Sequence, residues 1–416
     1  MVQLTDDCFA HGGRLMRTEE ALRLLAERLR RVTESERLPA GQALGRVLLE
    51  DVTARTGAPP HDNAAVDGYA VRHADLAADG ETRLPLGARI AAGHRPEGEI
   101  RPGTALRIFT GAVVPPGFDT IFMQEDCRAE SGEVILPAGL KAGANRRAAG
   151  EDFKAGDLLL RAGHRLRPQD LGLAAAAGHD SLAVSRPLKV ALFSTGDEIT
   201  EPGRDLPAAA VYDSNRYLLM GLAGSLGCEV TDMGILADEA ELVRSSLQRA
   251  AAGHDLIITS GGVSVGEEDH VKSAVESLGR LHAWRLAIKP GRPLALGQVA
   301  RVPFIGLPGN PVAVMVTFVT IARPAILRLM GARDLEPRRF KVAADFDFKK
   351  KKDRREWLRV KLEPAEGGWR AVIFPRQGSG ILSSLVEADG LVELPEDLTR
   401  LERGAMVDFL PFSEVT

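Results

Sequence analysis

The sequence contains little cysteine, and its cysteines are scattered. Only Cys8, Cys127 and Cys228 occur in 416 residues, and no two of them form a CxxC pair. This spacing fits neither a disulfide framework nor a structural zinc site. The histidines show no HExxH or similar ligand spacing, so a protein-held transition metal is not expected either. We therefore expect a protein of the reducing cytoplasm whose cysteines are structural.

Long apolar runs and a strong excess of one charge are also missing. The most apolar stretch, residues 311–322, is stopped by Arg323 and Pro324, which predicts a buried helix too short to cross a bilayer. The first ten residues carry Asp6 and Asp7 and lack the apolar region of a signal peptide. The net charge of −4 argues against bulk attraction to nucleic acid or to anionic membranes. We expect neither nucleic acid nor membrane as a partner.

The length predicts two to four domains, and the texture of the chain changes accordingly. Apolar residues recur at helical spacing after Thr18, and a second helical stretch at 168–177 is closed by Gly178. The residues between, 53–150, are rich in glycine and proline with short apolar runs typical of β-strands. We therefore predict an elongated helical linking domain, residues 1–52 plus 151–187, with a β domain inserted at 53–150.

Residues 188–331 alternate between strand and helix patterns. The predicted strands are 189–193, 228–233, 255–259, 281–288 and 302–305, and the predicted helices begin near Ser214, Asp238 and Asp269. Such alternation is typical of an α/β domain, a parallel sheet covered by helices on both faces. Residues 332–416 return to β texture and form a predicted small C-terminal β domain. The fold class is thus multidomain, combining α+β and α/β parts.

Three strands of the α/β domain end in loops of unusual composition: STGDE at 194–198, SGGVSVGEED at 260–269 and GLPGNP at 306–311. Ligands of open parallel sheets bind at the carboxyl ends of the strands. Glycine-rich turns let backbone N–H groups approach an anion closely. One such loop alone could be a tight turn, but three at one edge favour a phosphate-bearing ligand. The expected ligand-binding residues are Thr195, Gly196, Asp197, Ser260, Gly261, Gly262, Ser264, Gly266, Pro308, Gly309, Asn310 and Pro311.

Carboxylates and competing motifs refine this prediction. Glu198 and Asp269 lie in these loops and could hold Mg²⁺ against phosphate oxygens.

Neither a P-loop nor a GxGxxG fingerprint is present. A formal GxSxG at 262–266 lacks the hydrolase context, because only His270 and His282 follow it and no histidine lies further downstream. In the predicted β domain, Asp67 and Gly68 taken alone favour a hairpin turn.

Taken in order, several strings resemble one protein family. DNAAVDGYAVRHAD, RIFTGAVVP, NRRAAGEDF, ALFSTGDE, YDSNR, SGGVSVGEED, LAIKPGRP and GLPGNPV resemble the blocks of the MoeA and gephyrin E-domain family. The blocks span residues 62–312, and QGSGILSS at 377–384 fits as well. Eight ordered blocks are specific, although any one of them would be weak.

The resemblance implies a molybdopterin molybdenumtransferase. It implies an elongated four-part homodimer, with an α/β domain of the molybdopterin-binding type. The active cleft is expected between the α/β domain of one subunit and the inserted β domain of the other. Adenylylated molybdopterin and molybdate would be the substrates and Mg²⁺ the cofactor; AMP leaves and molybdenum ends on the dithiolene sulfurs. An upstream molybdopterin adenylyltransferase and downstream apo-molybdoenzymes are the expected partners.

The motif match also assigns residues. The expected catalytic carboxylates are Asp67, Glu198, Asp269, Asp152 and Asp238, with Thr110 as a positioning hydroxyl. Molybdate, a dianion, needs cations and hydroxyls, for which Lys289, Arg292, Ser379 and Arg359 are the candidates. The family more usually has serine and methionine where this chain has Ala64 and Val66, and lysine where it has Arg285 and Arg292. A substrate bond from residue 64 is thereby put in doubt, and anion geometry near 292 changes.

Two other functions compete with this one. The adenylyltransferase of the preceding step shares loops of the TGDE and SGGVSVGEED type, but the inserted and C-terminal β domains are not expected in it. A non-catalytic molybdopterin-binding scaffold would not need Asp67, Glu198 and Asp269 intact.

Overall fold

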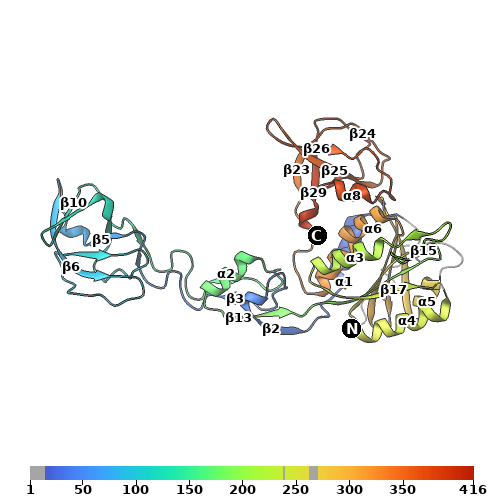
Figure 1. The fold of residues 1–416 in the computed structure, drawn as a ribbon, viewed down its shortest axis with the longest axis horizontal. Coiled ribbons are helices and arrows are strands. Elements are labelled where there is room, and N and C mark those ends of the chain that lie inside the picture. The colour runs from blue at the N-terminus through green and yellow to red at the C-terminus, as the bar shows by residue number, and fades with distance from the viewer. Residues whose placement is uncertain (1–14, 238, 262–269) are drawn as a thin grey trace.

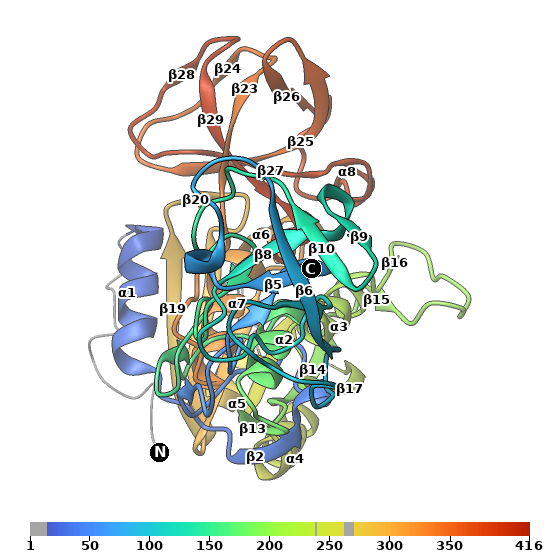
Figure 2. The same cartoon turned by 90° about the vertical axis from the view of Figure 1, so that its left-hand side faces the viewer.

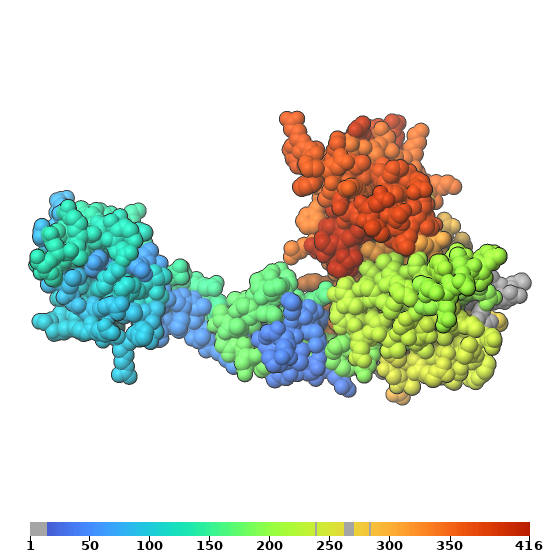
Figure 3. Space-filling model, viewed as in Figure 1, coloured from blue at the N-terminus to red at the C-terminus, as the bar shows by residue number. Residues whose placement is uncertain are grey.

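The computed structural model describes residues 15–237, 239–261 and 270–416. The molecule is elongated (Figure 1). The inserted β unit, residues 53–150, lies at one end, and the α/β layer with the C-terminal β barrel lies at the other. A narrow segment joins the two ends, and the space-filling view shows how slender it is (Figure 3). Cys8, predicted to be structural, lies outside the described residues.

The connecting segment consists of paired strands and one short helix. Strand β2 (Ser35–Pro39) pairs with β13 (Ser181–Ser185), and β3 (Val52–Thr53) pairs with β12 (Leu158–Leu160). Helix α2 (Pro168–Ala176) ends before Gly178, whose φ of +92° is the left-handed terminus expected there. The first helix, α1 (Thr18–Arg28), packs instead against the α/β core through Ala21 and Leu25. The connection is therefore mostly two-stranded ribbon.

The inserted unit is all-β, as predicted. Its main sheet has the order β8-β5-β7-β6-β10-β9, and β4 pairs with β11 beside it. The bounds are β4 (Asn63–Ala64), β5 (Gly68–Val71), β6 (Thr82–Ile90), β7 (Ala105–Ile108), β8 (Thr120–Met123), β9 (Arg128–Glu130), β10 (Glu133–Leu136) and β11 (Arg146–Arg147). A small core of alanine, isoleucine and leucine side chains holds this unit together independently of the rest.

Gly68 is not part of a hairpin turn. It begins β5, which lies between β7 and β8, and it pairs with Ile108 on one side and Met123 on the other. A Cβ at this position would lie 1.7 Å from the carbonyl oxygen of Phe122. The hairpin interpretation of Asp67 and Gly68 is therefore wrong: glycine is needed because the neighbouring strand passes too close for any side chain.

The α/β layer contains a seven-stranded sheet of order β1-β19-β21-β22-β18-β14-β17. Strands β17, β14, β18 and β22 are parallel, as predicted, but β21 is antiparallel to both of its neighbours and was not among the predicted strands. Only Ala300 and Arg301 connect β21 to β22, and a two-residue connection can join only antiparallel strands. The bounds are β1 (Leu15–Met16), β14 (Lys189–Thr195), β17 (Glu229–Leu236), β18 (Leu256–Ser260), β19 (Gly279–Leu286), β21 (Pro293–Val299) and β22 (Val302–Leu307).

Helices cover both faces of this sheet. On one face Leu192 and Ile258 pack beneath α3 (Asn215–Ser225) and α6 (Pro311–Thr317). On the other face Phe193 and Ile257 pack beneath α4 (Ala240–Gly253) and α5 (His270–Leu278). Two separate cores thus sandwich the sheet and fix the positions of its strand ends.

The apolar helix is longer than the sequence pattern predicted. It continues from α6 through the π-helical turn η5 (Phe318–Ala322) into α7 (Arg323–Leu329), so Arg323 and Pro324 do not stop it. The π turn ends two residues before Pro324, and such a turn accommodates the ring and the missing N–H of a proline. Length and composition alone would suit a membrane span, but 94% of this segment is buried inside the fold. The prediction that it forms a buried helix is confirmed.

The C-terminal unit is a small closed barrel, which is shown at the top of Figure 2. Strand β25 pairs with β26 and β27, and the ring closes through β23 and β29. Strand β20 (Ile288–Lys289) of the α/β layer also pairs with β25. The remaining bounds are β23 (Phe340–Ala344), β24 (Phe348–Lys349), β25 (Arg355–Ala365), β26 (Gly368–Ile373), α8 (Ser383–Glu387), β27 (Gly390–Leu394), β28 (Arg400–Leu401) and β29 (Met406–Pro411).

Replacing Gly68 by alanine should destabilise the inserted unit by about 2 kcal/mol or more, because its Cβ overlaps the Phe122 carbonyl. Gly172→Ala is the matched control, since Gly172 lies within α2 with nothing near a Cβ, and alanine is the better helix former there. Thermal unfolding followed by circular dichroism would compare the two. Equal unfolding temperatures for both variants would contradict the close strand approach.

Candidate functional site

A cavity of about 680 Å³ lies between the α/β layer and the C-terminal barrel. The loop after β14 contributes Glu198, and the segment around β20 contributes Lys289. The barrel contributes Arg359 of β25 and Ser379 of the following loop. The remaining lining residues are Gly261, Pro290, Gly291, Pro293, Pro308, Gly309, Asn310, Ala313, Phe348, Glu356, Trp357, Leu358, Gln377 and Gly378. Most of the predicted phosphate loops thus face one space, which the barrel closes.

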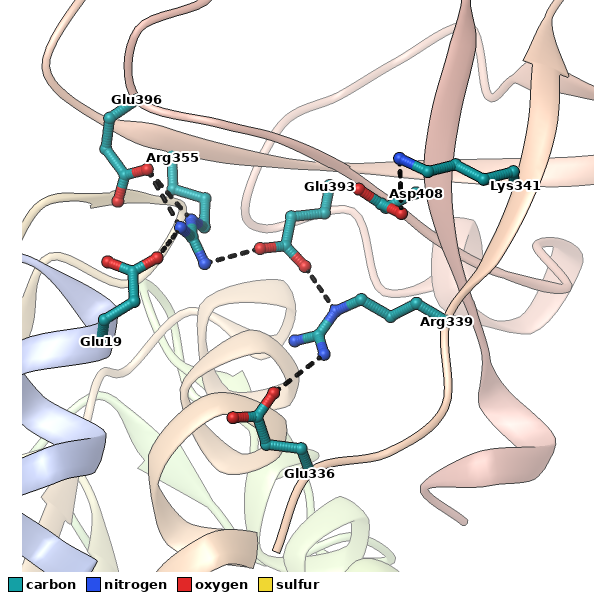
Figure 4. A network of polar contacts seen from close by, with 8 residues as sticks. All are labelled: Glu19, Glu336, Arg339, Lys341, Arg355, Glu393, Glu396 and Asp408. Carbon is teal, nitrogen blue, oxygen red and sulfur yellow. Dashed lines mark hydrogen bonds and ion pairs between the residues drawn. The ribbon is translucent and has the colours of Figure 1, made fainter.

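An ionic network holds the barrel in this position (Figure 4). Arg355, at the start of β25, contacts Glu19 of α1 and Glu396, and its Nη1 lies 2.6 Å from Glu393. Arg339 lies 2.7 Å from the other oxygen of Glu393. Arg339 also contacts Glu336. The two guanidinium groups, Glu393 and Glu396 are largely buried, whereas Glu19 and Glu336 are exposed. The network ties three chain segments together beside the cavity.

Arg359 is a buried cation with no carboxylate partner among the described residues. It is 1% exposed, and its guanidinium donates to Ser384 Oγ at 3.0 Å and to the carbonyl oxygens of Gly378 and Arg376. Burial lowers the pKa of Arg359 to about 10. These partners are all neutral, and a buried positive charge is costly unless an anion accompanies it. The cavity wall is therefore prepared for an anion.

Lys289 adds a second cation at the cavity. Its Nζ lies 3.4 Å from Glu356 Oε2, and Glu356, which is 1% exposed, also accepts a hydrogen bond from Arg354. This contact orients the half-exposed ammonium group of Lys289. Arg292, by contrast, is exposed and is not among the residues that line the cavity. The structure thus brings together Lys289, Arg359 and Ser379, but not Arg292.

A second, smaller cavity of about 310 Å³ adjoins the first at the ends of β14 and β18. Thr195, Ser260 and Pro311 line it, and Glu198, Gly261, Gly309 and Asn310 line both cavities. Ser260 Oγ donates to the carbonyl of Pro308 at 3.1 Å, which ties two of the predicted loops together. Gly261 has a φ of +87°, and a Cβ there would lie 2.6 Å from the Thr195 carbonyl oxygen. The three strand ends therefore converge as predicted for their described residues.

Glu198 occupies the shared rim of the two cavities. A Cβ on Gly196 would lie 2.6 Å from Glu198 Oε2, so glycine at 196 lets the carboxylate fold back over its own loop. Asp197 is exposed and lines neither cavity. The other predicted loop residues, Gly262, Ser264, Gly266 and Asp269, lie outside the described residues, as does Asp238.

The remaining predicted residues lie at the other end of the molecule (Figure 1). The hydroxyl and the N–H of Thr110 donate to Asp67 Oδ1 at 2.7 and 2.8 Å. These bonds, the hydroxyl first, lower the pKa of Asp67 below its ordinary value. Asp152 is exposed near the junction with the connecting segment, and Ala64 is buried in the core of the β unit. A single chain therefore separates Asp67, Thr110 and Asp152 from both cavities.

Two residues beside the cavities were not among the predicted site residues. Glu356 holds Lys289, and Asn215, the first residue of α3, bonds both Ser260 and the Gly309 carbonyl. Asn215 belongs to the YDSNR string, which marked it only through the family resemblance. Nothing in the sequence indicates Glu356, because its role depends on the pairing of β20 with β25.

Comparisons with known proteins agree along the whole chain. Residues 16–178 match the MoeA N-terminal region (domain I and II), residues 191–328 the "probable molybdopterin binding domain", and residues 341–412 the MoeA C-terminal region (domain IV). The molybdopterin molybdenumtransferase of Haemophilus influenzae is 36% identical over 96% of this chain and 100% of its own length. The enzyme of that name from a Nostoc species is 35% identical over 87% and 85%. The crystal structure of the molybdopterin biosynthesis MoeA protein from Pyrococcus horikoshii superimposes with a TM-score of 0.82 at 29% identity, covering 96% of this chain and 100% of that one.

Removing the Thr110 hydroxyl should raise the pKa of Asp67. In Thr110→Ala the backbone N–H bond remains but the largest cause of the lowered pKa is lost, so Asp67 should protonate at a higher pH than in the wild type. A ¹³C NMR titration of the Asp67 carboxyl carbon would measure this shift.

The matched control is Thr104→Ala in the same β unit, where the hydroxyl bonds the carbonyl of Arg101 instead. It should leave the titration of Asp67 unchanged. An unchanged pKa in Thr110→Ala would show that the hydroxyl does not stabilise the ionised carboxylate.

Proposed function

Since the chain belongs to the MoeA family, whose curated members are named molybdopterin molybdenumtransferases, we propose that it inserts molybdenum from molybdate into adenylylated molybdopterin with release of AMP. The observation that carries this proposal is the buried guanidinium of Arg359, which has neutral partners among the described residues and lines the same cavity as the phosphate loops. A transferase that joins an oxyanion to a phosphorylated ligand needs these two features in one cavity.

Molybdate, a tetrahedral dianion, is proposed to bind in the larger cavity. Arg359 and Lys289 offer positive charge in the wall of this cavity, and Ser379 offers a hydroxyl. Charge-assisted hydrogen bonds in a buried site are stronger than neutral ones. Arg359 is held by three neutral acceptors, so it needs little rearrangement to receive the anion. Gln377 fixes the backbone of β25 at Arg359. Its Oε1 accepts from the N–H of Arg359, and its Nε2 donates to the carbonyl oxygen of Arg359.

The phosphate groups of the pterin substrate are proposed to lie along the rim shared by the two cavities. There the loops of Gly261 and Gly309 bring backbone groups close to the ligand. Mg²⁺ commonly takes one or two carboxylates together with substrate phosphates, and the exposed Glu198 at this rim fits that donor set. When bound, Mg²⁺ would neutralise charge on the phosphoanhydride oxygens.

Asp67 is proposed to complete the site from a second subunit. Its carboxylate stays ionised because Thr110 stabilises it, which suits a group that orients water or an attacking oxygen at the anhydride. The β unit projects away from its own cavities, so it can approach only those of another copy (Figures 1 and 3). A homodimer with a shared active site supplies that copy. Asp152 lies at the base of the β unit and would approach the other subunit together with Asp67.

The competing functions explain less of the chain. An adenylyltransferase accounts for the α/β layer alone, whereas the N-terminal and C-terminal matches cover both β units. A scaffold gives no reason for a buried cation in the same cavity as the phosphate loops. We place the enzyme in the reducing cytoplasm. Burial raises the pKa values of Cys127 and Cys228 to about 11 and 12, so both remain protonated thiols, which fits a structural role for these cysteines. The adenylyltransferase of the preceding step and apo-molybdoenzymes are its proposed partners.

The reaction would be tested by AMP release from adenylylated molybdopterin under anaerobic conditions with Mg²⁺, over a range of molybdate concentrations. The wild type should release AMP only with molybdate. Arg359→Met should need at least about a hundredfold more molybdate, because two charge-assisted contacts are lost. Arg338→Met, which removes the same charge from an exposed position, should behave as the wild type.

AMP release that does not respond to molybdate, or tight pterin binding without any AMP release, would contradict the transferase. An unchanged molybdate requirement in Arg359→Met would leave the reaction standing but move the anion site elsewhere.

Sharing of the site would be tested by mixing two inactive variants, Asp67→Asn and Glu198→Gln. Each alone should be inactive, but a heterodimer contains one cleft with neither substitution. After subunit exchange, random pairing should restore about a quarter of the wild-type activity. Asp79→Asn, an exposed substitution in the same β unit, is the control and should remain active alone. Failure of the exchanged mixture to regain activity would place both carboxylates in one subunit's site.

A further inference from the structure

The side-chain amide of Asn215 lies where two ligand loops meet. Asn215 is 9% exposed, and its Nδ2 donates to Ser260 Oγ at 2.9 Å and to the carbonyl oxygen of Gly309 at 2.6 Å. One side chain at the start of α3 thus joins the loop after β18 to the loop after β22. Both loops line the smaller cavity, and so does Asn215 itself.

The hydrogen bonds leave no choice in how this amide is oriented. The Gly309 carbonyl can only accept, and Ser260 Oγ already gives its proton to the carbonyl of Pro308. Both partners of Asn215 therefore require a donor, so the nitrogen must face them and Oδ1 must face the other way.

In that direction Oδ1 is buried without a donor. No hydrogen-bond partner for Asn215 Oδ1 is found in the described parts of the chain, and the same holds for Thr195 Oγ1 in the same cavity wall. A buried acceptor without a donor is costly, so such atoms commonly mark places where a ligand completes the bonding. Asp213, also in this wall, is not free for that purpose because both its oxygens accept from Arg216.

The two cavities differ in charge. The larger one has the cations Lys289 and Arg359 in its wall beside the carboxylates of Glu198 and Glu356. The smaller one has Glu198 and Asp213, and no lysine or arginine is among the described residues that line it. An oxyanion is therefore favoured in the larger cavity. The smaller cavity, with its unpartnered acceptor, suits a neutral group that donates N–H bonds.

We propose that Asn215 is a substrate-binding residue whose Oδ1 accepts an N–H bond from the exocyclic amine on the aminopyrimidinone edge of the pterin ring. The ring then occupies the smaller cavity, and the phosphate and dithiolene end extends across the shared rim toward the molybdate. This assignment rests on the proposed function. It separates ring recognition from anion binding, and it gives Asn215 a role besides joining the loops.

The test compares two ring ligands, pterin and lumazine, by fluorescence titration of the full-length protein. Lumazine carries an acceptor oxygen in place of the exocyclic amine of pterin. The wild type should bind pterin about tenfold or more tightly than lumazine, because a site built for a donor rejects an acceptor. Equal affinities, or no pterin binding to the wild type, would overturn the proposal.

Two substitutions separate recognition from loop structure. Asn215→Asp and Asn215→Leu both lose the donor that joins the loops, but only the aspartate keeps an acceptor in the place of Oδ1. Asn215→Asp should keep the preference for pterin and Asn215→Leu should lose it. A preference lost equally in both variants would mean that the residue acts only through the loops, and would overturn the proposal.

AMP release distinguishes this inference from the proposed function. If the wild type shows molybdate-dependent AMP release but no preference for pterin, the reaction stands and the role of Asn215 fails. If the preference follows the acceptor as expected while no AMP is released, the binding role stands and the transferase assignment fails.

Discussion

The short pairing between β20 and β25 is the constraint on which the cavity depends. It places Lys289 opposite Glu356 and joins the α/β layer to the barrel. Because β25 continues from this pairing, Arg359 follows a few residues later on the barrel side of the space that the ligand loops border. The network around Arg355 strengthens the same junction through Glu19, Glu393 and Glu396 (Figure 4). Without this junction the cationic wall would not face the loops.

The distribution of charge around the site follows from where side chains are satisfied inside the protein. Arg216 is surrounded by Asp213, Asp232 and Glu201, so its charge is neutralised within the fold. Arg359 is equally buried but has only neutral partners among the described residues, so its charge is available to an anion that enters the cavity. Arg323 is also buried with backbone carbonyls as its hydrogen-bond partners among the described residues, but it lines neither cavity. Arg359 is therefore distinguished by its place in the cavity wall and not by burial alone.

The elongated shape separates the pieces of the proposed site. The β unit has its own core, and a narrow two-stranded connection joins it to the rest (Figure 3). Such a unit can present Asp67 and Thr110 as a preformed pair, since their bonds lie wholly within it. In the proposed dimer, the position of Asp67 and Thr110 relative to the cavities of the other subunit then depends on how the two subunits dock.

The sequence by itself determined the parts that depend on local chemistry. The alternation of strands and helices, the three loops at the strand ends and the all-β texture of residues 53–150 follow from short-range periodicity and from glycine and proline. Tertiary structure decided the rest, because it depends on contacts between distant segments. The antiparallel β21, the continuation of the apolar helix past Pro324 and the close strand approach at Gly68 all depend on neighbours far along the chain. So do the exclusion of Arg292 from the cavity and the unpartnered oxygen of Asn215, because burial and hydrogen bonding are properties of the assembled fold rather than of the residue.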